Sequence, residues 1–255
     1  MASDSERRPS PLQSHAASFW SANRRRPLFL VFLLIGLLLF LIWLPDGAQA
    51  LLGTALRAQR GLVVLLFLFA LVTLSLIWSG GQRLDAWVFM LFNMRGYPEW
   101  LDRFMWFATQ LGNMLAAFIT AALLFVLNQV SLAIGIILGT LTLWLLVEII
   151  KALSNRARPF LTLDKTRVIG WRERGDSFPS GHTTQIFFLM TLFIHHFQLG
   201  LGESIALYAL ATLVGFTRIY IGAHYPRDVL AGIVLGSVWG ILATLVDPYW
   251  FLLHI

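Results

Sequence analysis

Long apolar runs alternate with short polar stretches along most of the chain. Apolar runs of about 18 residues or more are long enough to cross the roughly 30 Å hydrocarbon core of a bilayer as helices. Seven segments have this character, at residues 27–44, 61–79, 112–128, 131–150, 181–199, 203–222 and 229–246. Between the second and third, residues 84–112 mix Trp, Phe and Met with scattered charges, which is typical of a helix along the membrane interface. The pattern therefore predicts an all-α fold, a polytopic membrane helix bundle.

The N-terminal end of the chain departs from this pattern. Residues 1–26 are rich in Ser and Arg and end in three successive arginines, so we predict a disordered basic tail. A single membrane-embedded domain is expected over residues 27–255. Its first segment precedes Ala48-Gln49-Ala50, which resembles a signal-peptidase site. Because the apolar run is longer than that of a usual signal sequence, a retained anchor is favoured over a cleaved signal.

Composition supports a membrane protein and narrows the choice of partners. The 255 residues are 58% hydrophobic and only 13% charged, far from the averages of soluble domains. Cytoplasmic loops, anionic headgroups or a phosphate ligand explain the net charge of +6, and no basic stripe interleaved with aromatic residues indicates a nucleic acid partner. The absence of cysteine excludes disulfides and thiolate metal sites.

Three polar clusters interrupt the apolar pattern, where ionisable side chains are costly and usually mark a site. The first, KALSNRARP, closes the fourth apolar segment. If the helix continues, Lys151 and Arg158 lie two turns apart on one face, about 10 Å from each other. Pro159 disfavours helix at the preceding residue, so Arg158 is expected where the helix ends.

The second cluster, SFPSGHTTQ, opens the fifth segment and has the form of a phosphate-binding turn that leads into a helix. Pro179 suits the turn or the first helical position, while Ser180 and Gly181 allow backbone amides to approach a ligand closely. A helix N-terminus offers unpaired N–H groups and the positive end of the helix dipole. Ser180 adds a hydroxyl donor, and His182 adds a proton carrier.

The third cluster, RIYIGAHYPRD, lies between the last two segments. Asp228 follows His224 by four residues with Pro226 between them, so a turn entering the last helix is expected rather than one continuous helix. A carboxylate near an imidazole fixes the tautomer and directs the other ring nitrogen outward. That arrangement is typical of a histidine nucleophile.

Each cluster alone has an ordinary structural explanation. Lys151 and Glu148 fit a simple helix pair. Arg158 and Arg218 fit interfacial anchors, and His182 fits a buried, hydrogen-bonded histidine. If the helices simply alternate, however, all three clusters end spans on the same side of the membrane. Three cations, two histidines, a serine and an aspartate in one place are costly unless they bind an anion, so we predict an anion site.

Together these residues resemble the tripartite signature of the type 2 phosphatidic acid phosphatase superfamily. The first motif is Lys, six residues and Arg-Pro, here Lys151 and Arg158-Pro159, and the second is Pro-Ser-Gly-His, here residues 179–182. The third is Ser-Arg, five residues, His, three residues and Asp, here Thr217, Arg218, His224 and Asp228, with threonine in place of the usual serine. The resemblance implies a six-span phosphatase core from about residue 61 onwards, with the segment at 27–44 as one extra N-terminal hydrophobic segment.

The resemblance also implies roles for these residues. His224 would attack phosphorus to form a phosphohistidine, Asp228 would orient it, and His182 would protonate the leaving oxygen. The groups that would bind the substrate phosphate are Lys151, Arg158, Ser180, Gly181 and Arg218. Positioning and charge stabilisation supply most of the catalysis of phosphoryl transfer. The resemblance therefore implies a metal-independent phosphatase without a cofactor, and the acidic residues near the clusters are too few for a two-metal site.

A site at the ends of membrane spans suits a lipid phosphate better than a soluble ester. The resemblance leaves undecaprenyl diphosphate, phosphatidylglycerol phosphate and phosphatidic acid as leading substrates, with lipid A phosphate behind them, and undecaprenyl diphosphate is favoured. Two alternatives stay open. One is a lipid phosphotransferase that uses the same site. The other is a non-catalytic anion or lipid transporter, which explains the cations but not the paired histidines with Asp228.

The loops give opposing indications of orientation in what is expected to be a bacterial plasma membrane. With seven alternating spans, the site side holds all of the 19 Lys and Arg except Arg57 and Arg60, so the positive-inside rule predicts a cytoplasmic site. Bacterial members of the resembling family usually place the site outside the cytoplasm. If the segment at 27–44 does not cross, the positive-inside prediction reverses.

Overall fold

The structure, a computed structural model, describes residues 57–250, with side chains for 57–245. The predicted tail at 1–26 and the segment at 27–44 lie outside the described residues. The described helices belong to one compact unit, Arg60–Ile255. These helices are α4 (Arg60–Ser75), α5 (Ser79–Asn93), α6 (Glu99–Thr109), η1 (Gln110–Gly112), α7 (Met114–Val126), α8 (Val130–Ser154), α9 (Pro159–Thr162), α10 (Gly181–His196), α11 (Leu201–Tyr220) and α12 (Pro226–Trp250).

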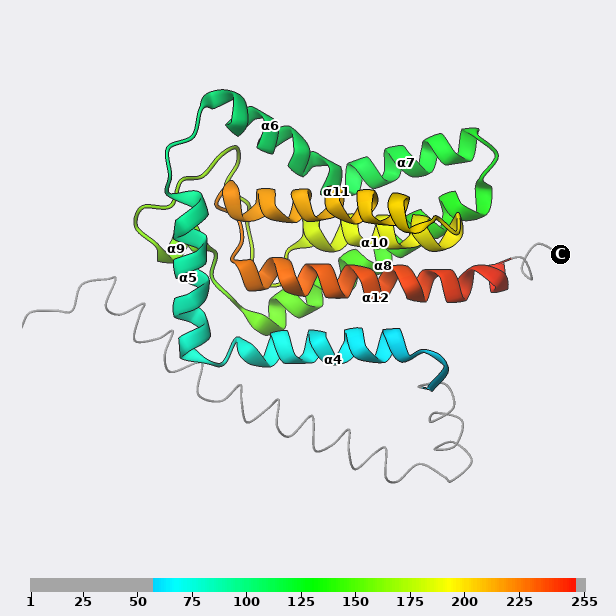
Figure 1. The fold of residues 1–255 in the computed structure, drawn as a ribbon, viewed down its shortest axis with the longest axis horizontal. Coiled ribbons are helices and arrows are strands. Elements are labelled where there is room, and N and C mark those ends of the chain that lie inside the picture. The colour runs from blue at the N-terminus through cyan, green and yellow to red at the C-terminus, as the bar shows by residue number, and fades with distance from the viewer. Residues whose placement is uncertain (1–56, 251–255) are drawn as a thin grey trace, which may run out of the picture. The chain divides into compact units, whose positions relative to one another are not determined.

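Most of these helices run lengthwise through one bundle, whereas α5 crosses one end of it (Figure 1). At that end α8 and α11 finish, and α10 and α12 begin. The three polar clusters therefore meet there, as the alternation predicted. Backbone hydrogen bonds join them directly, because the N–H of Ser180 donates to the carbonyl of Asp228 at 3.0 Å and the N–H of Ser177 donates to the carbonyl of Arg156 at 2.7 Å.

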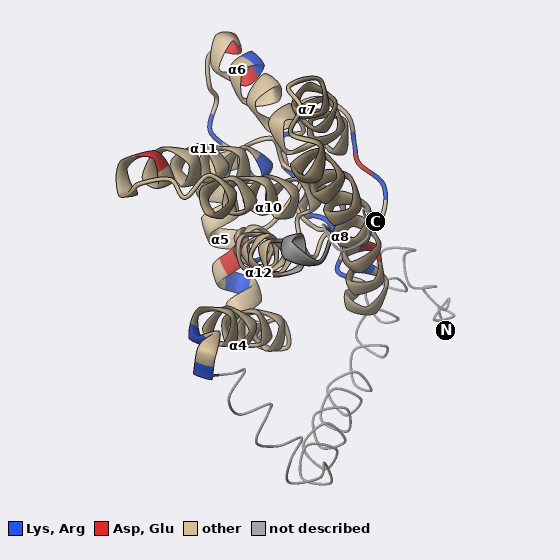
Figure 2. Cartoon of the chain, turned by 90° about the vertical axis from the view of Figure 1, so that its right-hand side faces the viewer, with Lys and Arg blue, Asp and Glu red and all other residues tan. Residues whose placement is uncertain are grey.

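Helix length and hydropathy fit a membrane protein. Two described stretches, Val130–Thr162 and Pro226–Leu245, are long and apolar enough to cross a membrane. Two bent pairs raise this number to four if each forms one span: α4 with α5, bent by 95°, and α6 and η1 with α7, bent by 60°. Charged side chains are few along the bundle and gather mainly at helix ends and in loops (Figure 2). The all-α class is confirmed for the described residues, and the six-span core with one extra segment stays a prediction.

The region predicted as one interfacial helix, residues 84–112, is broken in two. α5 ends at Asn93, and α6 begins after Pro98, which is extended with φ −65° and ψ 146°. Proline lacks the N–H that a helix interior requires and disfavours helix at the residue before it, which explains the break. The buried residues of α5 recur at every fourth position, so one stripe of this helix faces the bundle: Gly81, Asp85, Phe89 and Asn93.

The core of the bundle is built around α10, in which ten successive residues, 183–192, are buried. α12 packs closely against it through glycines at every fourth position. A Cβ on Gly236 would lie 2.8 Å from the Cβ of Phe187, and one on Gly240 would lie 2.6 Å from the Cβ of Thr191. Small residues at this spacing let membrane helices approach closely. This contact holds the start of α10 against the start of α12, where the polar clusters meet.

Candidate active site

His224 lies in the loop between α11 and α12 and is only 1% exposed. Its Nδ1 is 2.7 Å from the carbonyl oxygen of Ser177. Since a carbonyl oxygen only accepts hydrogen bonds, Nδ1 carries a proton, and the lone pair of the neutral ring is therefore on Nε2. The Nη1 of Arg158 lies 3.3 Å from Nε2, so this lone pair faces a guanidinium.

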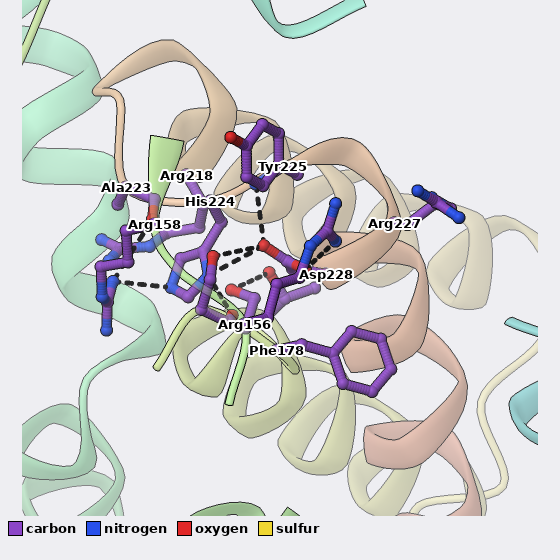
Figure 3. A network of polar contacts seen from close by, with 12 residues as sticks. Arg156, Arg158, Phe178, Arg218, Ala223, His224, Tyr225, Arg227 and Asp228 are labelled. Carbon is purple, nitrogen blue, oxygen red and sulfur yellow. Dashed lines mark hydrogen bonds and ion pairs between the residues drawn. The ribbon is translucent and has the colours of Figure 1, made fainter. Parts of the chain in front are cut away.

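Asp228 lies beside this imidazole, in the first helical turn of α12 (Figure 3). The chain between His224 and Asp228 is thus not one continuous helix, as the sequence predicted. Its Oδ2 accepts hydrogen bonds from the Oγ of Ser177 at 2.5 Å and the N–H of Tyr225 at 2.9 Å. Its Oδ1 pairs with Arg156. The distance from Oδ2 to Nδ1 of His224 is 3.6 Å. The hydrogen bond to the ring is therefore made by Ser177 rather than by Asp228.

The helix does not continue through the first motif, so the condition for a shared helix face is not met. α8 ends at Ser154, because Asn155 adopts a left-handed conformation with φ 45°. Lys151 and Arg158 therefore do not share a helix face. Arg158 is extended, with φ −74° and ψ 156°, directly before Pro159 at the start of α9. This confirms the effect expected of the proline on the preceding residue.

Both motif arginines, Arg158 and Arg218, are buried, being 2% and 1% exposed. Main-chain carbonyls hold the first: its Nε donates to Gly175 at 3.0 Å and its Nη1 to Ala223 at 3.3 Å. The second donates from Nη1 to the hydroxyl of Thr109 at 2.8 Å. Two guanidinium groups are thus fixed in the site, and the Nε of Arg218 is a donor without a partner among the described residues.

Thr217, which replaces the family's usual serine, is also buried. Its hydroxyl donates to the carbonyl of Val214, one turn earlier in α11, at 2.6 Å. The departure from the motif therefore leaves this hydroxyl bonded within the helix.

The second motif forms the entry to α10, which begins at Gly181. A Cβ on Gly181 would meet no atom within 4 Å, so this position opens onto free space. Ser180 is fully buried, and its Oγ accepts a hydrogen bond from Thr183 at 2.9 Å. The side chain of His182, one position into the helix, is 23% exposed. The glycine and the histidine thus face an accessible space, and the serine lies behind them.

A pocket of about 350 Å³ joins these groups. The predicted site residues that line it are Lys151, Arg158, Gly181, His182 and His224. Its remaining wall includes an apolar part from α7 and α8: Met114, Leu143, Trp144 and Val147. The Nζ of Lys151 is paired with Glu148 at 2.7 Å. The pocket is therefore lined by charged and polar groups together with an apolar wall.

Glu173, which no motif includes, places its carboxylate among these groups. Its Oε2 is 2.8 Å from Nη1 of Arg158, and its Oε1 pairs with Nη2 of Arg218. It also lies 3.8 Å from Nε2 of His224 and 4.0 Å from Nδ1 of His182. Burial raises the pKa of Glu173, but the neighbouring positive charge, that of the Arg218 guanidinium included, lowers this pKa more strongly, so it lies far below its usual range. An ionised carboxylate thus lies between Arg158 and Arg218.

A buried ionic network behind Asp228 was also missing from the predicted site. Arg156 bridges Asp228 and Asp85, and the Nε of Arg227 contacts Asp85 at 2.7 Å. The sequence held a signal for this network, because Arg156 lies between the cations of the first motif and Asp85 lies in an apolar stretch, where an unpaired charge is costly. The sequence did not indicate which charges would pair.

Comparisons with known proteins agree with this geometry. Residues 128–252, which contain all three motifs, match the model of the PAP2 superfamily. An undecaprenyl-diphosphatase from Sulfolobus acidocaldarius is 27% identical over 192 residues, which cover 72% of this chain and 90% of that protein. Among solved structures, LpxE from Aquifex aeolicus is 30% identical, with a TM-score of 0.56 over 62% of this chain and 93% of that chain.

A second solved structure, the first transmembrane PAP2 type phosphatidylglycerolphosphate phosphatase from Bacillus subtilis, shares the fold. It is 24% identical, with a TM-score of 0.64 over 74% of this chain and 96% of that chain.

Proposed function

Because the chain belongs to the PAP2 superfamily, we propose that it is an integral membrane lipid phosphatase that hydrolyses the terminal phosphate of a lipid phosphate or diphosphate. The observation that carries the proposal is the state of His224. Its Nδ1 is bound by the carbonyl of Ser177 at 2.7 Å, and its Nε2 lies 3.3 Å from the Arg158 guanidinium. A buried imidazole with its lone pair directed at an anion-binding group is arranged as a nucleophile towards a phosphate.

The reaction proceeds in two steps through a phosphohistidine. In the first, Nε2 of His224 bonds to phosphorus while the bond from phosphorus to the leaving oxygen breaks, and His182 gives that oxygen a proton. In the second, water attacks phosphorus, the bond from nitrogen to phosphorus breaks, and His182 takes a proton from the water. General acid catalysis of this kind typically contributes about a hundred- to ten-thousandfold.

Asp228 acts on the intermediate mainly by its charge. As Nε2 bonds to phosphorus, the imidazole ring becomes positively charged, because Nδ1 keeps its proton. The Asp228 carboxylate, 3.6 Å from Nδ1, stabilises that charge. It is buried and in contact with no bulk water, so the interaction is stronger than it would be in solvent.

The positive charge that a phosphoryl group requires comes from arginines in this proposal. Arg158 and Arg218 already hold the two carboxylate oxygens of Glu173, and phosphate oxygens would take the same places. The amide of Gly181, at the start of α10, and Lys151 complete the pocket-lining part of the proposed phosphate site, and the buried Ser180 hydroxyl is proposed to support it from behind. Among the described residues, no three His, Asp or Glu side chains gather as metal ligands, so a metal-independent reaction is proposed.

A membrane lipid is the proposed substrate because the pocket combines charged groups with an apolar wall. Its volume of about 350 Å³ suits a headgroup and the first carbons of a chain, and the apolar wall from α7 and α8 would lead the remaining chain to the bilayer. Undecaprenyl diphosphate, phosphatidylglycerol phosphate and phosphatidic acid are the proposed candidates. The similarity to an undecaprenyl-diphosphatase over 90% of that protein's length favours the first.

Phosphate release by the purified chain in detergent, without added metal and with a chelator, tests the proposal. The three candidate lipids are offered to the unmodified protein, to His224→Ala and to His195→Ala, which makes the same change at the exposed far end of α10. We expect release from at least one lipid by the unmodified protein and by His195→Ala, and a loss of at least about a thousandfold in His224→Ala.

Two other outcomes separate the alternatives. A phosphotransferase would pass the phosphoryl group to an added acceptor lipid, and analysis of the lipid products would detect this. If none of the three lipids loses phosphate and the rate does not differ between the unmodified protein and His224→Ala, the site is not that of a lipid phosphatase, and an anion or lipid transporter becomes the better interpretation.

A further inference from the structure

Ser177 occupies a central position beside the nucleophile, although it lies outside the three motifs. It is fully buried in the loop before α10. Its carbonyl oxygen is 2.7 Å from Nδ1 of His224, and its Oγ donates to Oδ2 of Asp228 at 2.5 Å. Its N–H donates to the carbonyl of Arg156 at 2.7 Å. Its polar backbone and side-chain atoms are thus bonded to three residues of the site region.

The distance between Asp228 and His224 shows why these bonds matter. Oδ2 of Asp228 and Nδ1 of His224 are 3.6 Å apart, which is too long for a hydrogen bond. The proton on Nδ1 is instead donated to the Ser177 carbonyl. A hydrogen bond on one ring nitrogen decides which tautomer is present and where the other nitrogen points. That control over the nucleophile thus belongs to Ser177.

We propose that Ser177 is a positioning residue for His224, through which Asp228 acts on the orientation of the imidazole. The inference rests on the proposed function, because it assigns His224 as the nucleophile. The carbonyl of Ser177 holds the ring and its tautomer, and the hydroxyl ties that peptide unit to the Asp228 carboxylate. Asp228 then contributes in two ways, by fixing Ser177 and by its charge on the ring.

The serine side chain is needed even though any residue supplies a carbonyl. The direction of that carbonyl depends on how Ser177 is held, and the two anchors that Ser177 itself makes are the hydroxyl bond to Asp228 and the N–H bond to the Arg156 carbonyl. Arg156 supports both, since its guanidinium also pairs with Oδ1 of Asp228 (Figure 3). Removing the Ser177 hydroxyl leaves Ser177 with one of these anchors and lets the ring turn.

The expected effect is on turnover rather than on binding. Ser177 does not line the pocket formed by the described residues, so Ser177→Ala should leave KM nearly unchanged. Its kcat should fall about ten- to a hundredfold, as expected from the loss of one hydrogen bond to a charged group. Ser237→Ala on α12 is the matched control, because it removes a hydroxyl that bonds only to the carbonyl of Ile233 within its own helix.

A double-mutant cycle distinguishes positioning from a merely structural role. Phosphate release is measured for Ser177→Ala, Asp228→Asn and the double variant. If Asp228 orients the ring through Ser177, Asp228→Asn should reduce kcat less in the Ser177→Ala background, where only its charge on the ring is lost, than in the unmodified protein, where the orientation is lost as well. Rate reductions that simply multiply, or a Ser177→Ala variant with unchanged kcat, would overturn the inference. Ser177→Cys keeps a weaker donor and should lose less activity than Ser177→Ala.

Nitrogen-15 NMR of histidine-labelled protein supplies a readout that does not depend on turnover. The expected result is an Nδ1-protonated His224 in the unmodified protein and a mixture of tautomers in Ser177→Ala. An Nε2-protonated ring in the unmodified protein, or the same single tautomer in both, contradicts the inference. If the unmodified protein releases no phosphate from any lipid, the proposed function fails, whereas the NMR result still decides whether Ser177 controls the ring.

Discussion

Replacement of Glu173 by glutamine should strengthen substrate binding. The Glu173 carboxylate lies 2.8 Å from the Arg158 guanidinium and pairs with Arg218. These two guanidinium groups are also the proposed binding site for the phosphate oxygens. A substrate therefore has to displace this carboxylate before it binds. Both arginines keep other partners when it leaves, the carbonyl of Gly175 and the hydroxyl of Thr109, so the empty site remains formed.

The size of the effect follows from the charge that is removed. A hydrogen bond to a charged group contributes about 1.5–3 kcal/mol. The side chain of Glu173 is 31% exposed, and solvent screening reduces the contribution of such a pair. A value just below this range, about 1.4 kcal/mol, corresponds to a roughly tenfold lower KM. The kcat should change little, because the carboxylate is absent from the site once substrate is bound.

Kinetics of phosphate release in mixed micelles measure this effect, together with the inhibition constant of inorganic phosphate. Glu99→Gln is the control, because it removes the same charge from a side chain that is 89% exposed on α6. Glu173→Asp keeps the charge on a side chain one methylene shorter, and its KM should lie between the KM of Glu173→Gln and that of the control. A KM for Glu173→Gln that is equal to or higher than that of the unmodified protein would refute the idea that this carboxylate occupies the phosphate site.

Four further results are expected. The pKa of Glu173 lies below its ordinary value of 4.5. Its ion pairs therefore stabilise the fold above about pH 4.5, and this stabilisation is lost as the pH falls towards the lower pKa of the folded state. Glu173→Gln should lower Tm more at pH 7 than at pH 4. Arg156→Met removes the cation shared by two buried carboxylates and should destabilise the fold by about 3–5 kcal/mol, as measured by thermal unfolding in detergent, and an unchanged Tm would show that the network contributes nothing. Gly236→Ala places a methyl group against α10 and should cost about 1–3 kcal/mol, whereas Gly135→Ala on α8, where a Cβ meets no atom within 4 Å, should not destabilise; equal melting temperatures for the two would contradict the close helix contact. Because His224 attacks through an unprotonated Nε2, kcat/KM should fall at acidic pH, and a rate that stays flat on acidification would argue against this nucleophile.

The positions of the helices were predictable from the apolar pattern because most of them coincide with long hydrophobic stretches. The segments predicted at 181–199, 203–222 and 229–246 correspond to α10, α11 and α12. Alternation of these helices also predicted that the three motifs meet at one end. The stripe Gly232, Gly236 and Gly240, which brings α12 against α10, was present in the sequence as a spacing of four but formed no part of the prediction.

The partners of the charged residues were not predictable, for a physical reason. A charge in an apolar segment has to be neutralised, but which opposite charge reaches it depends on the packing of distant segments. Asp85 and Arg156 are 71 residues apart and meet only because α5 crosses the end of the bundle. Glu173 lies in a loop between two arginines of the sequence, yet pairs with Arg158 and Arg218 instead. The left-handed residue that ends α8 likewise has no signal in the apolar pattern.

The proposed mechanism depends on a covalent bond between His224 and phosphorus, which rapid quenching can detect. Lipid phosphate labelled with phosphorus-32 is mixed with the purified protein for less than one turnover, and the protein is then denatured in alkali, in which phosphohistidine is stable. We predict label on the unmodified protein, lost on treatment with acid, and none on His224→Ala. Phosphate release without labelled protein at any time, or equal labelling of His224→Ala, would contradict the mechanism.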